Sequence, residues 1–493
     1  MIVRKVLYFG SRWAGARAWC VALALATTTA AAHGQTTSPM GNPSSAANPF
    51  YGSVTLRPAT GEVLQLSLDE AVRRGLENNL GLRESESGEK VVQGEKNEAL
   101  QEFLPTITVS GGTGLFQHNL AALGFGPGVA KEFASILGMT GGGSFNPITH
   151  DDLTQGQINY SQILFSGPVI AGWRAAGAAE KAAHFAKMSA RGEVVQQVAT
   201  AYLHAIAAAS EVDQAKALQQ ADQVAFDQAH EAHEAGTMAN LDELRARVQL
   251  QAQEQAVIAA QNTFDKDLIL VKREIGVDSG QKIVLTDTAP YNELAEETPE
   301  EVRAVAYKNR QDWQNLQNQL VEVKAIHASY RSQRFPTLTF GGFYGVDKVN
   351  GSIAHGDFAA MGTLSVPLFN EAKLRGDEES AAAQLDSVRL QLEDLRSHID
   401  QQVRSALLDV HATHQLVEVG RSNVDLATRE LSDETDRVNA GVDDNLPLVT
   451  AQSTLATAQS NLIENLYQYN LSKLALARAA GILEQQYRVY LGR

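Results

Sequence analysis

Residues 104–112 have the sequence LPTITVSGG and residues 335–343 have the sequence FPTLTFGGF, and this pair of stretches decides the fold. Each stretch follows a long segment that has no strand character. Pro105 and Pro336 lie 231 positions apart, and the same offset aligns Ser67–Ala71 with Thr298–Val302. Self-similarity at a fixed offset identifies a repeated unit, so the chain contains one unit written twice.

The second half of each repeat aligns at a smaller offset. Residues 235–242 (AGTMANLD) match residues 440–447 (AGVDDNLP) at an offset of 205, and Phe165 and Phe369 lie 204 positions apart. The smaller offset means that the first copy carries about 27 extra residues between its two strand segments. We expect these residues in a loop at roughly residues 113–152.

The repeats and the N-terminus divide the chain into five segments. Residues 1 to about 34 combine basic residues, an apolar run from Trp19 to Ala26 and a small-residue end, which is the pattern of a signal peptide. The other segments are an extended leader at 35–62, the first repeat at 63–280, a linker at 281–297 and the second repeat at 298–493. Within the linker we predict a short strand at Ile283–Leu285.

Composition argues against two classes of function. The chain has 57 acidic and 41 basic residues and a formal net charge of -16, so we do not expect a nucleic-acid partner. Cys20 is the only cysteine and lies in the predicted signal peptide, which excludes disulfides and thiolate catalysis in the mature chain. The pairs His230/His233 and His411/His414 have i, i+3 spacing and no third ligand, so we predict no metal site and no cofactor.

Four segments alternate apolar with polar or small residues, as strands do when their two faces differ. Their apolar positions are Ile107 and Val109, Ile158 and Tyr160, Leu338 and Phe340, and Leu364 and Val366. Four strands are too few to enclose a lumen, and open edges are excluded from lipid. Three chains with four strands each would close a twelve-stranded barrel. From alternation alone, a soluble pair of hairpins is the alternative.

The segments that follow the strands are predicted to form very long helices. No proline interrupts the sequence from Pro168 to Ala235, and a returning helix is expected at Leu241–Ile275. Apolar or small residues recur in steps of three and four, which predicts a coiled-coil seam. The seam residues are Val194, Val198, Ala201, Ala205, Ala208, Val212 and Ala215 in the first copy, and Leu448, Leu455, Leu462, Tyr469 and Leu476 in the second. Glutamines 249, 251, 253, 255 and 261 suit either a hydrated tunnel wall or a solvated outer face.

The whole arrangement resembles the outer-membrane efflux protein family, the TolC-like channels. The resemblance rests on Leu66–Val72 (LSLDEAV) with Glu77–Asn79, the strand starts Leu104-Pro-Thr and Phe335-Pro-Thr, the stretch Val366–Asn370 (VPLFN), and the two Gly-containing turns between long helices.

The resemblance implies a homotrimer with a β-barrel in lipid of the outer membrane and an α-helical tunnel in the periplasm. It also implies passive export, in which a periplasmic adaptor (membrane fusion) protein and an inner-membrane pump deliver the substrate. The pump would be a resistance-nodulation-division or an ABC transporter. The implied fold is mainly α, built from two tandem helix-strand-strand-helix-helix repeats.

By the same resemblance, the two turns form the closed aperture of the tunnel at its periplasmic tip. The corresponding residues are Gly236, Asn240 and Asp242 in the first copy, and Gly441, Asp443, Asp444 and Asn445 in the second. The second copy has Pro447 and Thr450 where the family's acidic ring is expected. Asp443 and Asp444 either restore negative charge there or are solvated turn residues.

Two other functions compete with a channel. A periplasmic coiled-coil adaptor or scaffold would share the signal peptide and the helices but would lack the repeated strand hairpins. An enzyme is a distant third hypothesis, because no nucleophile–base–acid arrangement or phosphate-binding loop is present in the sequence.

Overall fold

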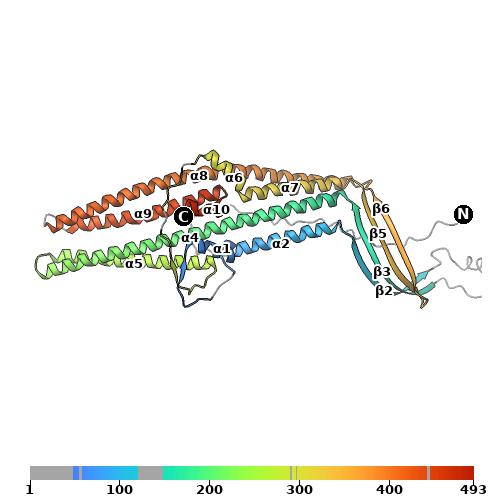
Figure 1. The fold of residues 1–493 in the computed structure, drawn as a ribbon, viewed down its shortest axis with the longest axis horizontal. Coiled ribbons are helices and arrows are strands. Elements are labelled where there is room, and N and C mark those ends of the chain that lie inside the picture. The colour runs from blue at the N-terminus through green and yellow to red at the C-terminus, as the bar shows by residue number, and fades with distance from the viewer. Residues whose placement is uncertain are drawn as a thin grey trace, which may run out of the picture. The chain divides into compact units, whose positions relative to one another are not determined.

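The computed structural model describes residues 48–54, 58–119, 148–288, 291–295, 297–440 and 445–492. The predicted signal peptide lies outside the described residues, as does most of the predicted loop at 113–152. All described elements belong to one unit, Ser44–Arg493. Within this unit, a set of two helices, two strands and two long helices occurs twice along the chain, as Figure 1 shows.

The two repeats have matching elements in the same order. The first contains α1 (Leu68–Asn78), α2 (Leu80–Gln101), β2 (Thr106–Asn119), β3 (Ile148–Phe165), α4 (Gly167–Glu234) and α5 (Asn240–Ile275). The second contains α6 (Pro299–Asn309), α7 (Gln311–Ser332), β5 (Thr337–Val349), β6 (His355–Ser365), α8 (Glu371–Asn439) and α9 (Asn445–Ala479). Outside this pattern lie η1 (Pro49–Tyr51), β1 (Leu64–Leu66), β4 (Ile283–Leu285) and α10 (Leu483–Tyr490). The predicted tandem repeat is confirmed.

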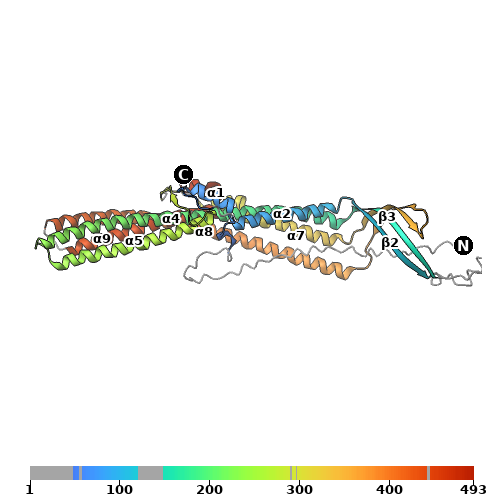
Figure 2. The same ribbon diagram turned by 90° about the horizontal axis from the view of Figure 1, so that it is seen from below.

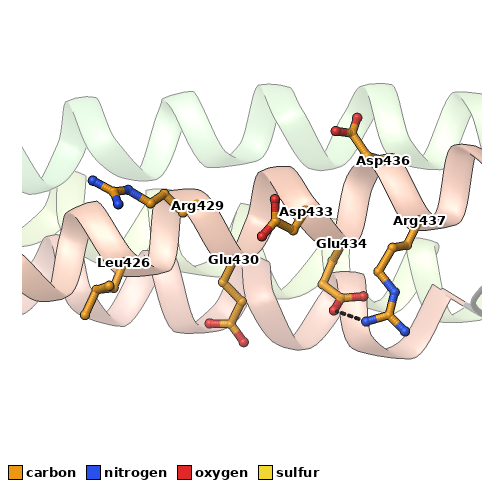
Figure 3. A pocket seen from close by; sticks show the side chains of 7 residues that line it. All are labelled: Leu426, Arg429, Glu430, Asp433, Glu434, Asp436 and Arg437. Carbon is orange, nitrogen blue, oxygen red and sulfur yellow. Dashed lines mark hydrogen bonds and ion pairs between the residues drawn. The ribbon is translucent and has the colours of Figure 1, made fainter.

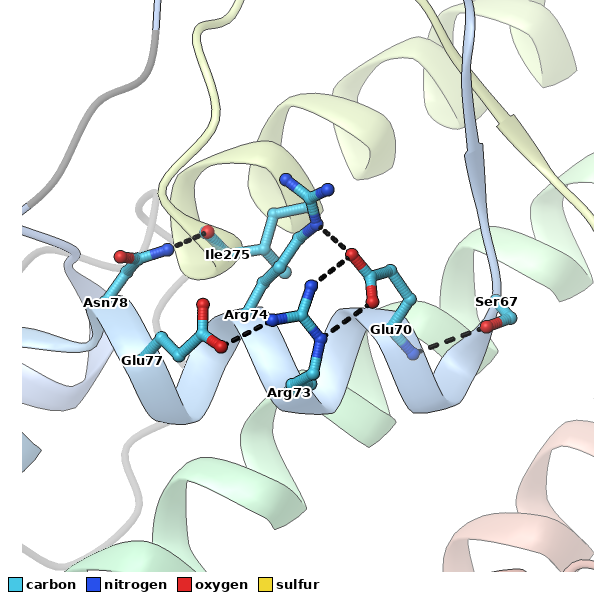
Figure 4. A network of polar contacts seen from close by, with 7 residues as sticks. All are labelled: Ser67, Glu70, Arg73, Arg74, Glu77, Asn78 and Ile275. Atoms are coloured by element: carbon cyan, nitrogen blue, oxygen red, sulfur yellow. Dashed lines mark hydrogen bonds and ion pairs between the residues drawn. The ribbon is translucent and has the colours of Figure 1, made fainter.

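Each repeat begins with a helix that is broken once, which the sequence did not predict. Asn79 has φ -63° and ψ 133°, and Arg310 has φ -65° and ψ 123°, so a single extended residue separates α1 from α2 and α6 from α7. At the first break, the Asn79 side chain accepts a hydrogen bond from the backbone N–H of Leu82 and caps α2. The neighbouring Asn78 side chain donates to the carbonyl of Ile275 at 3.0 Å, which fixes the end of α1 on the end of α5 (Figure 4).

The start of α1 is specified by its own sequence. The Ser67 hydroxyl accepts a hydrogen bond from the backbone N–H of Glu70, which is a cap that contributes about 1 kcal/mol. Arg74 Nε donates to Glu70 Oε1 at 2.6 Å, and Arg73 bridges Glu70 and Glu77 on the same side of the helix (Figure 4). The Arg73 pairs are exposed and the Arg74 pair is partly buried, so each adds only modest stability, but together they favour the helix within the chain itself.

The long helices pack through the small-residue seams that the sequence predicts. α4 has 68 residues and α8 has 69, which makes each about 100 Å long. Every predicted seam residue of α4 is buried, and in α9 Leu455, Tyr469 and Leu476 are buried while Leu448 and Leu462 are half-buried. α5 runs beside α4 and α9 runs beside α8 (Figures 1 and 2). Within the described ranges, every helix is too short or too polar to span a lipid bilayer.

The main core lies where the short helices meet the long ones. Val194, Val198 and Tyr202 of α4 are buried in one cluster with Leu68 and Val72 of α1. Gly75 allows the approach, because a Cβ at this position would lie 2.6 Å from Cγ2 of Val198. The sheet β1–β4 flanks this core as a parallel pair, which confirms the strand predicted at Ile283–Leu285.

The four long strands form one antiparallel sheet in the order β2-β3-β5-β6. The expected loop at residues 113–152 is wrong at both ends, because β2 continues to Asn119 and β3 already begins at Ile148. Three of the four residues Gly111–Gly114 are glycines, which are poor strand formers, but an unbroken ladder pairs the segment with Leu153–Gly156. Cross-strand pairing therefore overrides the weak local preference for strand.

We predict opposite effects for two Gly→Ala changes in adjacent helices. Gly75→Ala should lower the free energy of unfolding by about 1–2 kcal/mol, because overpacking against Val198 outweighs the gain in helix propensity. Gly88→Ala in α2, where a Cβ meets no atom within 4 Å, should raise it by about 1 kcal/mol. Denaturation of the purified protein in detergent measures both. Equal stability of the two variants would contradict the close α1–α4 packing.

Candidate functional site

The register of the four-stranded sheet gathers apolar residues of every strand on one face. Val109 of β2 lies opposite Ile158 of β3, Ile158 lies opposite Tyr344 of β5, and Tyr344 lies opposite Phe358 of β6. Directly opposed residues share a face, so these four form one apolar row across the sheet. We call this the apolar face; its members are Ile107, Val109, Leu115, Ile158, Tyr160, Leu338, Phe340, Tyr344, Val346, Phe358, Ala360 and Leu364. Val109 is 79% exposed and Phe358 is 74% exposed, so nothing described in the chain covers this face.

The opposite face of the same sheet is mainly polar. Asn159 Nδ2 donates to Ser110 Oγ at 3.1 Å across the β2–β3 pair, and Gln157 lies opposite Ser110. Its polar members are Thr106, Thr108, Ser110, Gln157, Asn159, Ser161, Thr339, Asp347, Asp357 and Thr363. We call this the polar face. Its apolar exceptions are Phe116, Leu153, Ile163, Phe343, Val349, Ala359 and Met361. The apolar face in turn carries the polar residues Thr113, Gln117, His150, Asp152, Thr154, Gln162 and Lys348. A sheet with one apolar and one polar face is suited to separate two different environments.

The sheet has two open edges. β2 pairs with β3 alone and β6 pairs with β5 alone among the strands of the described residues. An edge strand directs alternate backbone N–H and C=O groups away from its single neighbour, and these groups are available to pair with another strand. The edges are long, because β2 has 14 residues and β6 has 11.

Seven of the eight predicted strand positions lie in strands and on the apolar face, namely Ile107, Val109, Ile158, Tyr160, Leu338, Phe340 and Leu364. Val366 is a correction, because β6 ends at Ser365. Ser365 pairs with Thr337, so the next partner of Val366 would be Pro336, which has no N–H to donate. Pro367 follows at once and prevents the ladder from restarting.

The first tip, residues 235–240, is a turn fixed by backbone hydrogen bonds. Gly236 has φ +72°, a left-handed conformation that favours glycine. The N–H of Gly236 donates to the carbonyl of His233 and the N–H of Thr237 donates to the carbonyl of Ala232, both at 2.9 Å, which is the Schellman ending of a helix. Asn240 then begins α5.

Polar side chains hold the two helices together behind the first tip. His230 Nδ1 lies 2.8 Å from Glu243 Oε1, and this carboxylate raises the pKa of His230. His233 Nδ1 donates to the carbonyl of Met238 at 3.1 Å. The sequence analysis missed the role of Glu243. This residue lies 13 positions from His230, and the two can be expected to meet only when the exact position of the turn between them is known. The predicted aperture residue Asp242 makes an ion pair with Arg245 at 3.0 Å.

The second tip is described only in part. Gly441, Asp443 and Asp444 lie outside the described residues, and Asn445 is the first residue of α9. Just before this tip, the surface of α8 carries a charged patch, which comprises Leu426, Arg429, Glu430, Asp433, Glu434, Asp436 and Arg437 (Figure 3). Arg437 pairs with Glu434 at 3.1 Å. The sequence analysis did not single out this patch, since charged residues on a helix commonly form a solvated face. The aperture itself stays a prediction.

Comparison with known proteins gives a direct assignment of family. The family model described as "Outer membrane efflux protein" matches residues 71–276 and 304–482, which is most of both repeats. The chain belongs to the outer membrane efflux protein family. No curated protein matches the sequence.

Solved structures share the fold of this family member. The CmeC outer membrane channel of Campylobacter jejuni has a TM-score of 0.70 and 14% identity, and the match covers 91% of this chain and 94% of that one. VceC of Vibrio cholerae has a TM-score of 0.68, 16% identity and coverages of 84% and 96%. The MtrE channel of Neisseria gonorrhoeae, solved in an open state, has a TM-score of 0.66, 16% identity and coverages of 88% and 96%.

Membership in the outer membrane efflux protein family decides between the competing functions. Proteins of this family are outer-membrane channels and not enzymes, so this chain is an efflux-type channel protein of the outer membrane. The alternatives of an adaptor or scaffold and of an enzyme are therefore rejected.

Two neighbouring alanines of β6 test which face of the sheet contacts lipid. Ala360 lies on the apolar face and Ala359 on the polar face, and both are exposed. Ala360→Lys should reduce insertion into outer membranes strongly, because a lysine near the bilayer midplane costs about 2–4 kcal/mol. Ala359→Lys is the matched control and should insert as the unmodified protein does. The amount of protein in purified outer membranes measures both; a stronger defect for Ala359→Lys would reverse the assignment of the faces.

Proposed function

We propose that three copies of the chain join their sheets edge to edge into a closed twelve-stranded barrel, and that substrates cross the outer membrane passively through its lumen. The observation that carries this proposal is the four-stranded sheet with two open edges and one exposed apolar face. Four strands do not close, and eight give an interior that side chains fill. Three copies are the smallest number that removes every edge and leaves a lumen.

The two faces of the sheet support this arrangement. On joining β6 of one copy to β2 of the next, the apolar face of every copy would turn toward lipid and the polar face toward the lumen. The lumen would then carry Ser110, Gln157, Asn159 and the carboxylates of Asp347 and Asp357. Such a wall is wetted by water and has no shaped pocket, which suits conduction and not selective binding.

The helices also expose residues that neighbouring copies would cover. Leu244 and Val248 lie one turn apart on α5 and are 49% and 65% exposed. On α8 the exposed apolar residues include Leu408, Leu416, Val419 and Leu426. An uncovered apolar stripe on a helix favours association with another copy, so the same contact that closes the barrel would continue along the helices.

Family membership supports a proposal for the partners of this chain. The helices would hang into the periplasm, with both tips directed toward the inner membrane. A periplasmic adaptor would dock on the tips, and an inner-membrane pump of the resistance-nodulation-division or ABC class would drive export, as in a tripartite efflux or type I secretion system. The charged patch on α8 and the paired His230 and Glu243 place polar groups where such a partner would make contact.

The assembly is tested by the mass of the purified protein. Extracted from outer membranes in detergent, it should have three times the mass of one chain by light scattering, and should shift to the monomer position on a gel after boiling. The trimer should give conductance steps in a planar bilayer, because its lumen is open to ions. A monomer that stays in aqueous buffer without detergent would overturn the barrel.

Export is tested in cells. A strain without this protein should be more sensitive to dyes or drugs, and an adaptor and pump should co-purify with the tagged protein after crosslinking. Restored resistance by Ala359→Lys but not by Ala360→Lys would connect export to the inserted sheet. Unchanged sensitivity together with no co-purified pump would contradict the tripartite system while leaving the barrel intact.

A further inference from the structure

A buried carboxylic acid lies between three helices on the tip side of the molecule. Asp222 of α4 is 4% exposed, and among the aspartates that the structure describes it alone is buried. It borders a cavity of about 10 Å³, close to the smallest volume that holds a water molecule. The cavity is enclosed by α4, α5 and α9, so Asp222 lies where the first helical hairpin, α4–α5, meets the second hairpin, α8–α9.

Among the residues that the structure describes, those that line the cavity beside Asp222 include two amides and no cation. From α5 the cavity is lined by Ala246 and Gln249, and from α9 by Leu448, Val449 and Gln452, all of which are uncharged. The Gln249 side chain favours the charged form of the Asp222 carboxyl group, but this effect is smaller than the effect of burial. A carboxylate in such a place loses its hydration without gaining a counter-charge, and burial raises the pKa of Asp222 above its ordinary value of about 3.9.

The contact in which Asp222 lies is weaker than the seams inside each hairpin. Farther along the same contact, Gln214 Nε2 donates to the carbonyl of Ala456 at 2.9 Å, and Ser460 Oγ donates to Glu211 Oε2 at 3.0 Å. Charged or titratable groups of α4 face α9 at three points of this contact, all on the side away from the tips. Glu211 lies three turns of helix from Asp222, the ring of His204 lies 5.3 Å from that of Tyr467, and Glu193 pairs with Arg478. Near the short helices the contact is held by the main core, in which Leu474 and Leu476 of α9 are buried with Tyr202 of α4. Toward the tips the polar contacts add only about 1 kcal/mol each, so one ionisation is enough to change the balance there.

We propose that the contact between α4 and α9 is proton-dependent: Asp222 holds a proton while the two hairpins are packed together and releases it to water when they part. The device belongs to the fold of the single chain and does not depend on the proposed barrel. Low pH fastens the two hairpins to each other near the tips, and higher pH loosens them.

Proton linkage gives the direction in which pH changes the stability of the packed state. When the hairpins are parted, Asp222 is in water and ionises at about pH 3.9. When the hairpins are packed together, Asp222 keeps its proton to higher pH. Between these two pKa values the parted state binds fewer protons, so the packed state loses stability as the pH rises. The equilibrium constant for parting increases by up to about tenfold per pH unit in this range and is constant below and above it.

Hydrogen–deuterium exchange of the full-length protein in detergent tests this device. The measured amides are those of residues 448–457 of α9, with rates divided by the intrinsic rate at each pH between about 4 and about 8. In the unmodified protein their protection should fall by up to about tenfold per pH unit over part of this range. Asp222→Asn keeps an amide for Gln249 to bond and cannot ionise, so its protection should be independent of pH.

Asp213→Asn is the matched control, because Asp213 is an exposed aspartate on α4. It should keep the pH dependence of the unmodified protein. Protection that falls equally with pH in Asp222→Asn, or that does not change with pH in the unmodified protein, would overturn the proposal. The second of these results needs no variant, so the test stands even if Asp222→Asn fails to fold. Failure of the barrel would appear in the mass measurement and not here.

Discussion

The backbone hydrogen bonds at the two edges of the four-stranded sheet are the constraint on which the rest of the structure depends. Within the described part of the chain β2 and β6 each have one neighbouring strand, and every second backbone group along them points away from the sheet. In hydrocarbon each such unpaired group costs several kcal/mol, which the apolar face of one sheet cannot offset. A sheet that is apolar on one side but open at both ends is therefore stable in a membrane only when other strands complete it.

The helices are not subject to this constraint, because their backbone groups form hydrogen bonds within each helix and their polar side chains can contact water. Inside each hairpin the seam consists of buried small and apolar side chains such as Ala205 and Val212, which allow backbones to approach closely. Between the hairpins the contacts are apolar near the short helices, where Leu474 and Leu476 join the main core, and polar toward the tips, as Gln214 and Ser460 show. Toward the tips the two hairpins are therefore joined more weakly to each other than the helices within each hairpin are, and motion is expected there between the hairpins and not within them.

Much of this fold was predictable from the sequence, since alternation and heptad spacing are local properties. The parity of Ile107 and Val109 and the seam from Val194 to Ala215 needed only side-chain periodicity. Features that depend on pairing were not predictable. The extension of β2 through Gly111–Gly114 is imposed by its partner strand, and the end of β6 at Ser365 depends on Pro336 in another strand.

The helix breaks and several site residues were likewise not predictable, because they depend on contacts between segments that are distant in the sequence. Asn79 and Arg310 interrupt their helices in stretches with ordinary helical patterns, because the contacts that favour the break come from other segments, such as the bond of Asn78 to Ile275. The pairing of His230 with Glu243 requires the exact turn between them. Asp222 sits in a polar, Gln-rich stretch where an acid is unremarkable, and only the packing of three helices shows that it is buried.

The last helix completes the core that the first one begins. Leu483 and Leu491 lie in the same cluster as Leu66 and Leu68, and Tyr487 donates to Asp69 at 2.7 Å across 418 positions of sequence. Such contacts have a very high sequence separation, so they form late and slowly. While the chain is still being synthesised its core lacks its final part, so the main core can close only after the last residues of the chain have been added.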